Sequence, residues 1–105
     1  MSKSPITTDD EWLHNPHAGE LLVSEFMEPL ELDCASVARA IGIDAERLSA
    51  VISGTSRMDG ELDLRLSRYF RMSEGFFLRL QDQFELREAK RMLDGDLDQI
   101  VPRAA

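Results

Sequence analysis

The chain has 105 residues, enough for one domain with a single modest core, and its apolar (43%) and charged (30%) fractions are those of an ordinary globular protein. No apolar run approaches the roughly 18 residues that would span a bilayer, and we expect neither membrane association nor a signal peptide. The single cysteine, Cys34, allows no internal disulfide, so a cytoplasmic protein is expected. The net charge of −8 is unusual for a protein that binds nucleic acid.

The first elements predicted along the chain are a short turn and a helix. The T-x-x-E pattern over residues 8–11 is that of a capping box, so a helical turn is expected there, with Trp12 as a lid on the core. A full helix is expected from about Gly19 to Glu28, and His17 is expected either to cap it or to bond the backbone. Its apolar stripe would consist of Leu22, Phe26 and Leu30.

Residues 33–54 have the pattern of two short amphipathic helices joined at a glycine, which is typical of a helix-turn-helix. Gly42 stands where the first helix must end in a left-handed turn, and Ile43 would fill that turn with an apolar side chain. Ala38 would allow close helix packing, and Asp44 would cap the second helix. The apolar stripes would be formed by Val37, Ile41, Leu48, Val51 and Ile52. A plain helical hairpin in a bundle is the alternative.

Two further helices are expected after the loop over residues 54–58. Asp59 would cap a helix that ends near Phe70, and Ser73 would cap a long helix from about Glu74 to Asp94. The buried positions would be Leu62, Leu66, Tyr69 and Phe70 on the first, and Phe77, Leu80 and Phe84 on the second. A second stripe on the long helix, formed by Leu86, Ala89 and Leu93, predicts a homodimer interface, unless the helix packs that stripe over its own domain.

Most of the net negative charge lies in the first third of the chain. Residues 1–34 contain one base and eight acids, whereas residues 35–57 contain three arginines and two acids. An acidic segment beside a near-neutral unit favours a basic protein partner, and solubility alone is the alternative. We therefore expect an all-α fold in three parts: an acidic extension with a short turn over 1–16, the helix-turn-helix domain with its dimerisation helix over 17–94, and a mobile tail over 95–105.

Four sequence blocks between His17 and Gln81 occur in the order and at the spacing of a known family. They are H-A-G-E-L-L over 17–22, V-A-R-A-I-G-I over 37–43, D-L-R-L-S-R-Y-F over 63–70, and Ser73 with F-F-L over 76–78 and Leu80-Gln81. On these blocks the chain resembles the HigA-type (VapI-type) antidote proteins of bacterial toxin–antitoxin modules, which belong to the Xre-like helix-turn-helix group.

The resemblance implies a five-helix, lambda-repressor-like helix-turn-helix domain with a long C-terminal helix, dimeric and cytoplasmic. It also implies that the protein neutralises a basic RelE-like ribonuclease toxin and represses its own operon by binding operator DNA. The acidic residues expected to meet the toxin are Asp9, Asp10, Glu11, Glu20, Glu25 and Glu28. The residues expected at the DNA are Cys34, Arg39, Ala45, Glu46, Arg47, Ser49, Ala50, Ser53, Thr55, Ser56 and Arg57. Arg47 could bind guanine through two hydrogen bonds, and Glu46 could accept one from cytosine.

Three positions depart from the family pattern. Cys34 replaces a glutamine that bonds a DNA phosphate in the family. The basic residue of the loop is shifted by one position to Arg57, so Ser56 stands in its usual place. Asp59 replaces a threonine that would touch a phosphate. These departures leave two alternatives: an antidote-like interaction protein with weakened or lost DNA binding, and a stand-alone Xre-like transcriptional regulator.

Other chemistry has little support in the sequence. The pair His14 and His17 has no third ligand in a fixed register, so no metal site is expected. The D-x-D-x-D pattern at 94–98 lacks the glycine and closing glutamate of a calcium loop. No nucleophile with its base and no phosphate-binding glycine loop is present, so neither an enzyme nor a cofactor is expected.

Overall fold

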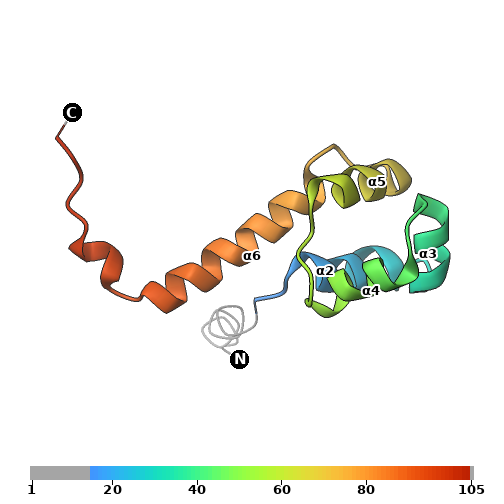
Figure 1. Ribbon diagram of the computed structural model, residues 1–105, viewed down its shortest axis with the longest axis horizontal. Coiled ribbons are helices and arrows are strands. Elements are labelled where there is room, and N and C mark those ends of the chain that lie inside the picture. The colour runs from blue at the N-terminus through green and yellow to red at the C-terminus, as the bar shows by residue number, and fades with distance from the viewer. Residues whose placement is uncertain (1–14, 105) are drawn as a thin grey trace, which may run out of the picture.

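A computed structural model describes residues 15–104, and all of its regular elements are helical (Figure 1). They are α2 (Ala18–Leu21), continued by the π-helical segment η1 (Leu22–Met27), α3 (Cys34–Ile41), α4 (Ala45–Ser53), α5 (Gly60–Phe70), α6 (Phe76–Leu93) and the short 3-10 helix η2 (Asp96–Gln99). Taken with α2 and η1 as one helix, the described part confirms the expected all-α, five-helix fold. The turn expected at 8–11, Trp12 and His14 lie outside the described residues.

The first helix begins at a reciprocal cap, as expected for His17. The Nδ1 atom of His17 accepts from the backbone nitrogen of Gly19 at 3.0 Å, and Glu20 accepts from the backbone nitrogen of His17 at 3.0 Å. The apolar stripe is only partly as predicted, because Leu22 is buried but Leu30 is 61% exposed. The helix ends at Met27, and the chain turns before Leu30 is reached, so Met27 supplies the last buried side chain instead.

The helix-turn-helix forms over the predicted residues. Asp33 accepts from the backbone nitrogen of Ser36 at 2.8 Å and caps α3. Gly42 has the left-handed conformation (φ 79°) that ends α3. Asp44 occupies the N-cap position of α4 as expected. The predicted side-chain cap is wrong, because the Asp44 carboxylate accepts no capping hydrogen bond.

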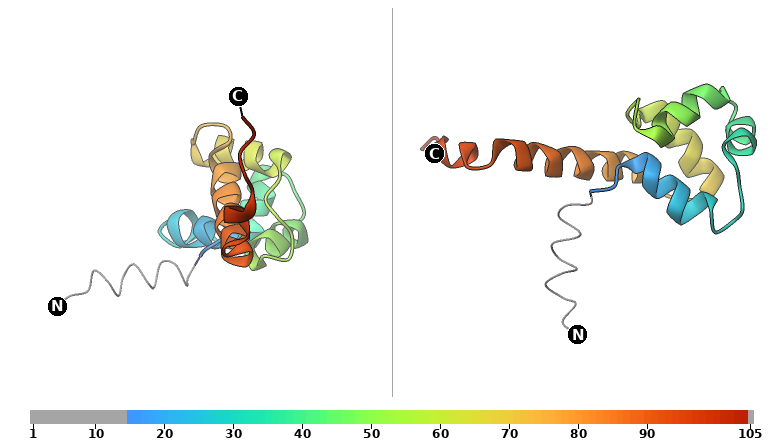
Figure 2. Two further views of the ribbon diagram at one scale, coloured as in Figure 1. Left: turned by 90° about the vertical axis from the view of Figure 1, so that its left-hand side faces the viewer. Right: turned by 90° about the horizontal axis from the view of Figure 1, so that it is seen from below.

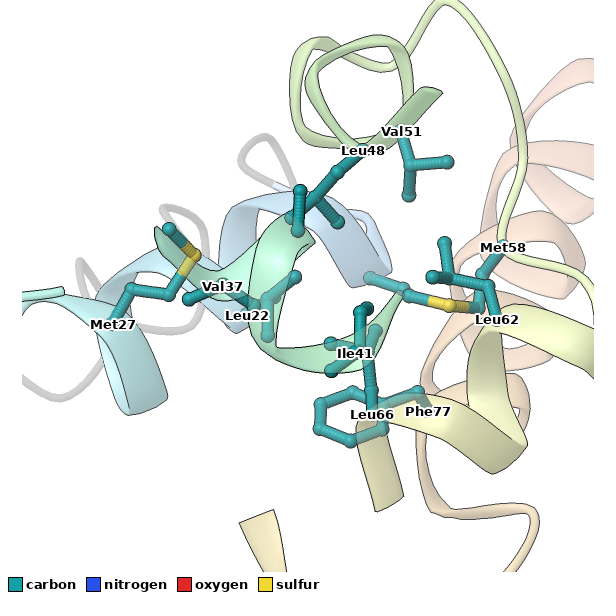
Figure 3. Close-up of a cluster of buried hydrophobic side chains, with 12 residues drawn as sticks. Leu22, Met27, Val37, Ile41, Leu48, Val51, Met58, Leu62, Leu66 and Phe77 are labelled. Carbon is teal, nitrogen blue, oxygen red and sulfur yellow. The ribbon is translucent and has the colours of Figure 1, made fainter. Parts of the chain in front are cut away.

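The core lies where the helix-turn-helix meets α5 and α6. Val37, Ile41, Leu48 and Val51 are buried with Leu62, Leu66, Met58 and Phe77. Figure 3 shows side chains of this cluster converging from α3, α4, α5 and α6. Asp59 caps α5 as predicted, accepting from the backbone nitrogen of Leu62 at 2.9 Å. Tyr69 was expected in the buried stripe, but it is 41% exposed, because the buried face of α5 runs through Leu62 and Leu66 and leaves Tyr69 at its edge.

The start of α6 differs from the sequence expectation. We expected Ser73 to cap a helix from Glu74, but α6 begins at Phe76 after Gly75. The buried carboxylate of Asp63, on α5, accepts hydrogen bonds from the backbone nitrogens of Gly75 (2.7 Å), Phe77 (2.8 Å) and Leu78 (3.1 Å). A side chain distant in sequence thus replaces the local cap that the pattern predicted.

The second half of α6 leaves the helical body. Figures 1 and 2 show α6 as a straight rod that extends past α2–α5 and leads to η2. From Ala89 to Ala104 every residue is exposed. Apolar side chains are exposed along this half of α6, among them those of Leu86 (61% exposed) and Met92 (82% exposed).

Candidate nucleic-acid interface

The outer edge of α4 is open to solvent. Leu48 and Val51 bury one side of this helix, so the opposite side faces away from the core. Ala45, Glu46, Ser49 and Ser53 are exposed there, and Ala50 is half-buried beside them. All five belong to the predicted DNA-contacting set, and α4 has the length and exposure that a helix needs to enter a major groove.

Arg47 is the one basic residue of α4, and it is bound to α5. Its Nη2 atom lies 3.3 Å from both carboxylate oxygens of Asp59 and 3.3 Å from Oε1 of Glu61. Arg47 therefore bridges the N-terminal turn of α5 rather than extending from the outer edge. The contact with guanine expected from the sequence requires that Arg47 first leave these carboxylates.

Cys34 lies at the junction of the two motif helices. Its thiol donates a weak hydrogen bond to the backbone oxygen of Ala45, with a sulfur–oxygen distance of 3.6 Å. Partial burial and the neighbouring charge of Asp33 raise the pKa of the Cys34 thiol above its usual range. The thiol is therefore protonated at neutral pH, and it ties α3 to α4 instead of presenting an amide donor to a phosphate.

The loop after α4 turns back on the helix end. The backbone nitrogens of Thr55 and Ser56 both donate to the carbonyl oxygen of Ala50, at 2.9 and 3.0 Å. The hydroxyls of Ser53 and Thr55 lie 3.0 Å apart, within hydrogen-bond distance. Thr55, Ser56 and Arg57 are all exposed, so this predicted part of the interface is accessible.

Arg57 is held by acidic residues of α6. Its Nε and Nη2 atoms donate to the two carboxylate oxygens of Glu85 at 2.8 and 3.2 Å, and Nη2 lies 3.6 Å from Asp82. The hydrogen bond with Glu85 raises the pKa of Arg57, and the same bond, followed by one from Gln81, lowers the pKa of Glu85. Of the three arginines in the motif and its loop, only Arg39 makes no ion pair within the described part of the chain.

Gln81 anchors this loop, a role that the sequence analysis did not assign. Its side chain is buried, accepts from the backbone nitrogen of Met58 at 3.3 Å, and donates to Glu85 at 2.9 Å. Gln81 was visible as the last residue of the fourth family block. Its place in that block marked Gln81 as a residue of the family pattern. The block did not indicate its partner, because Met58 lies 23 residues before it in the chain.

The described residues expected at protein partners lie on the first helix and on α6. Glu20, Glu25 and Glu28 are exposed along the first helix, and Glu20 also takes part in the cap with His17. Asp9, Asp10 and Glu11 lie outside the described residues. The residues expected in the dimer interface, Leu86, Ala89 and Leu93, are exposed on the projecting half of α6.

Within residues 15–104, no group of three or more His, Cys, Asp or Glu side chains is arranged to hold a metal ion. None of the helices there is both long enough and apolar enough to cross a bilayer.

Comparison with curated proteins finds several relatives, although no protein-family model matches the chain. An uncharacterised helix-turn-helix-type transcriptional regulator of Haemophilus influenzae is 31% identical over 68 residues, which are 65% of this chain and 64% of that protein. This chain thus spans slightly less than two thirds of that relative. Virulence-associated protein I of Dichelobacter nodosus is 27% identical over 75 residues, 71% of this chain and 69% of that protein.

Solved structures share the fold across most of the chain. A Pseudomonas aeruginosa protein in complex with its operator DNA is 27% identical to this chain, with a TM-score of 0.81. The superposition covers 88% of this chain and 98% of that protein. The P. aeruginosa antitoxin HigA with its promoter is 24% identical, has a TM-score of 0.77, and covers 88% of this chain with its whole length. The first of these neighbours was solved with its operator DNA, and the second is named as an antitoxin.

Proposed function

We propose that this chain, which is similar to a helix-turn-helix-type regulator and shares its fold with an antitoxin HigA, belongs to the family of the HigA-type antidote proteins and is a binding protein with two working surfaces. The exposed edge of α4 and the loop that follows it bind operator DNA. The acidic N-terminal region and first helix bind and neutralise a basic RelE-like ribonuclease toxin. Together the two activities let the protein repress the operon that encodes it.

The observation that carries the DNA half is the accessible outer edge of α4. Its exposed alanine and serine side chains are small, so the helix backbone is able to approach the floor of a major groove. The similar P. aeruginosa protein was solved with its operator DNA, which supports the same use of the fold here. Arg39, exposed on α3, is the arginine of the motif most readily available to a phosphate.

A fluorescence anisotropy titration at low salt tests the DNA half, with a labelled duplex from the region upstream of the coding sequence and a scrambled duplex for comparison. We expect binding with a Kd below about 10 µM, tighter for the upstream duplex. Ser49→Glu places a negative charge on the exposed edge of α4 and should abolish binding. Ser24→Glu adds the same charge to an exposed position of η1 and should leave binding intact. Absence of binding at about 10 µM would contradict this half of the proposal.

The toxin half is supported by the concentration of acidic residues in the first third of the chain. Exposed glutamates attract a basic protein over a distance and accelerate its association. The double reversal Glu25→Lys and Glu28→Lys should therefore slow association with the basic protein encoded beside this gene. Asp96→Lys and Asp98→Lys, on η2, are the matched control for charge. Equal association rates for the two double variants would show that the first helix is only a solvated surface.

One observation favours a second function, that of an interaction protein with little DNA binding. Arg47 and Arg57 are both neutralised by carboxylates of their own chain, which leaves few free cations for phosphate. This alternative predicts a flat promoter titration together with co-purification of the basic partner. The stand-alone regulator is distinguished from both by the neighbouring reading frame: a gene for a small basic protein there counts against it.

A further inference from the structure

The contact between α4 and α5 opposes the proposed use of Arg47. Arg47 sits on the helix that would read DNA, yet its guanidinium is shared between Asp59 and Glu61 at 3.3 Å. A guanidinium in contact with two carboxylates has satisfied much of the attraction that a phosphate or a guanine would otherwise exploit. DNA must therefore compete with α5 for this side chain.

The carboxylates are the fixed partners in this contact. Asp59 is also the cap of α5, because its Oδ1 atom accepts from the backbone nitrogen of Leu62 at 2.9 Å. Glu61 is also held through Oε2 by Nε of Arg65 at 3.1 Å. Arg65 in turn donates to the carbonyl oxygen of Ile41 at 2.7 Å, which anchors it to the end of α3. Neither carboxylate is free to follow Arg47 toward a ligand.

We propose that Asp59 and Glu61 set the affinity of this chain for DNA by holding Arg47 away from the duplex. The inference rests on the proposed function and specifies how its DNA surface is regulated. Arg47 exchanges between two sets of acceptors, the α5 carboxylates and the phosphates or base edges of DNA. The ion pairs are half-exposed, so they are weak enough to be displaced and strong enough to reduce affinity measurably.

The test removes the two charges without removing the α5 cap. Asp59→Asn keeps an acceptor at the capping position, and Glu61→Gln keeps the shape of its side chain. We expect the double variant to bind the upstream duplex and a random duplex about three- to tenfold more tightly than the natural chain, as expected from the loss of two exposed ion pairs. The control is Glu74→Gln with Asp98→Asn, which removes two exposed carboxylates that pair with no arginine in the described residues. It should change the Kd less than twofold.

A second arm asks whether the gain passes through Arg47. In an Arg47→Ala background the same two substitutions should give no gain, because the released cation is absent. A gain that persists there would overturn the inference, since the carboxylates would then act only by repelling DNA. Single Glu61→Gln, which leaves the cap untouched, provides the same comparison should the double variant unfold, as judged by circular dichroism.

The outcomes separate this inference from the proposed function. If the natural chain binds DNA and the charge-neutral variants bind equally well, the inference fails and the function stands. If only the charge-neutral variants bind at about 10 µM, the inference is supported and the DNA half of the proposed function fails for the natural chain. If no variant binds either duplex at about 10 µM, the limit set for the proposed function, both are overturned.

Discussion

Gly19 of the first helix lies against the backbone of Val51 in α4. A β-carbon built on Gly19 would overlap the carbonyl oxygen of Val51 and lie 2.8 Å from the α-carbon of Ile52. The two helices are therefore as close as their backbones allow, and only glycine fits at this crossing. The contact supports α4 from its inner side and leaves the outer edge for a ligand.

Gly19→Ala should destabilise the protein by about 1–3 kcal/mol, because the added methyl group forces two backbones apart. Urea unfolding followed by circular dichroism measures the change. Gly60→Ala is the matched control, since a β-carbon at Gly60, in the first turn of α5, meets no atom within 4 Å. That control should be neutral or stabilising by up to about 1 kcal/mol, as alanine favours helix. Equal effects of the two substitutions would show that the crossing is not tight.

Asp63→Asn should cost about 3 kcal/mol of unfolding free energy, because the buried carboxylate satisfies three backbone nitrogens at the start of α6. An amide in its place has one oxygen acceptor and directs its own donor toward those nitrogens. The urea midpoint should fall, whereas Asp98→Asn, an exposed substitution of the same kind, should leave it unchanged. An unaltered midpoint for Asp63→Asn would mean that α6 is positioned by apolar packing alone.

Local rules were enough to predict most of the fold from the sequence. The ends of α3 and α4, the left-handed turn at Gly42 and the caps at His17 and Asp59 depend on residues within a few positions of one another. The start of α6 was misplaced because its cap, Asp63, lies 12 residues before Gly75. Contacts of that separation follow from tertiary packing and leave no periodic signal in the chain.

The candidate site was predictable in position but not in its electrostatics. The exposed face of α4 follows from helical periodicity, since the buried positions define the opposite side. The partners of Arg47 and Arg57 do not follow, because they lie on α5 and α6, 12 and 28 residues away. The net charge of residues 35–57 suggested a near-neutral helix-turn-helix. In the folded chain, four carboxylates lie against Arg47 and Arg57: Asp59, Glu61, Asp82 and Glu85.

The Arg57–Glu85 pair should make a small pH-dependent contribution to stability. Arg57 and then Gln81 lower the pKa of Glu85 in the folded chain, so folding favours the ionised carboxylate. The stabilisation is present above the ordinary glutamate pKa and is lost as the pH falls through the depressed value. Because both side chains are about half exposed, the contribution should stay below about 1 kcal/mol.

Glu85→Gln tests this by urea unfolding at pH 7 and again at acidic pH. The variant should be less stable than the natural chain at pH 7, and the difference should shrink as the pH falls below the glutamate range. Glu74→Gln, an exposed substitution without an arginine partner in the described residues, should show no such change. A difference of the same size at both pH values would assign the effect to packing of Glu85 rather than to its charge.

The projecting half of α6 should form a homodimer interface. Leu86 is 61% exposed and Leu93 38% exposed on a rod that extends beyond the helical body (Figure 2), and exposed leucines in such a row favour association. Leu86→Glu with Leu93→Glu should convert a dimer into a monomer, because a second copy would bury the charges without partners. Sedimentation velocity measures the change.

Leu64→Glu, at a leucine of α5 that is 50% exposed, should leave the dimer intact. A natural chain that sediments as a monomer at about 100 µM would contradict the predicted homodimer, and disruption by Leu64→Glu alone would move the interface to α5.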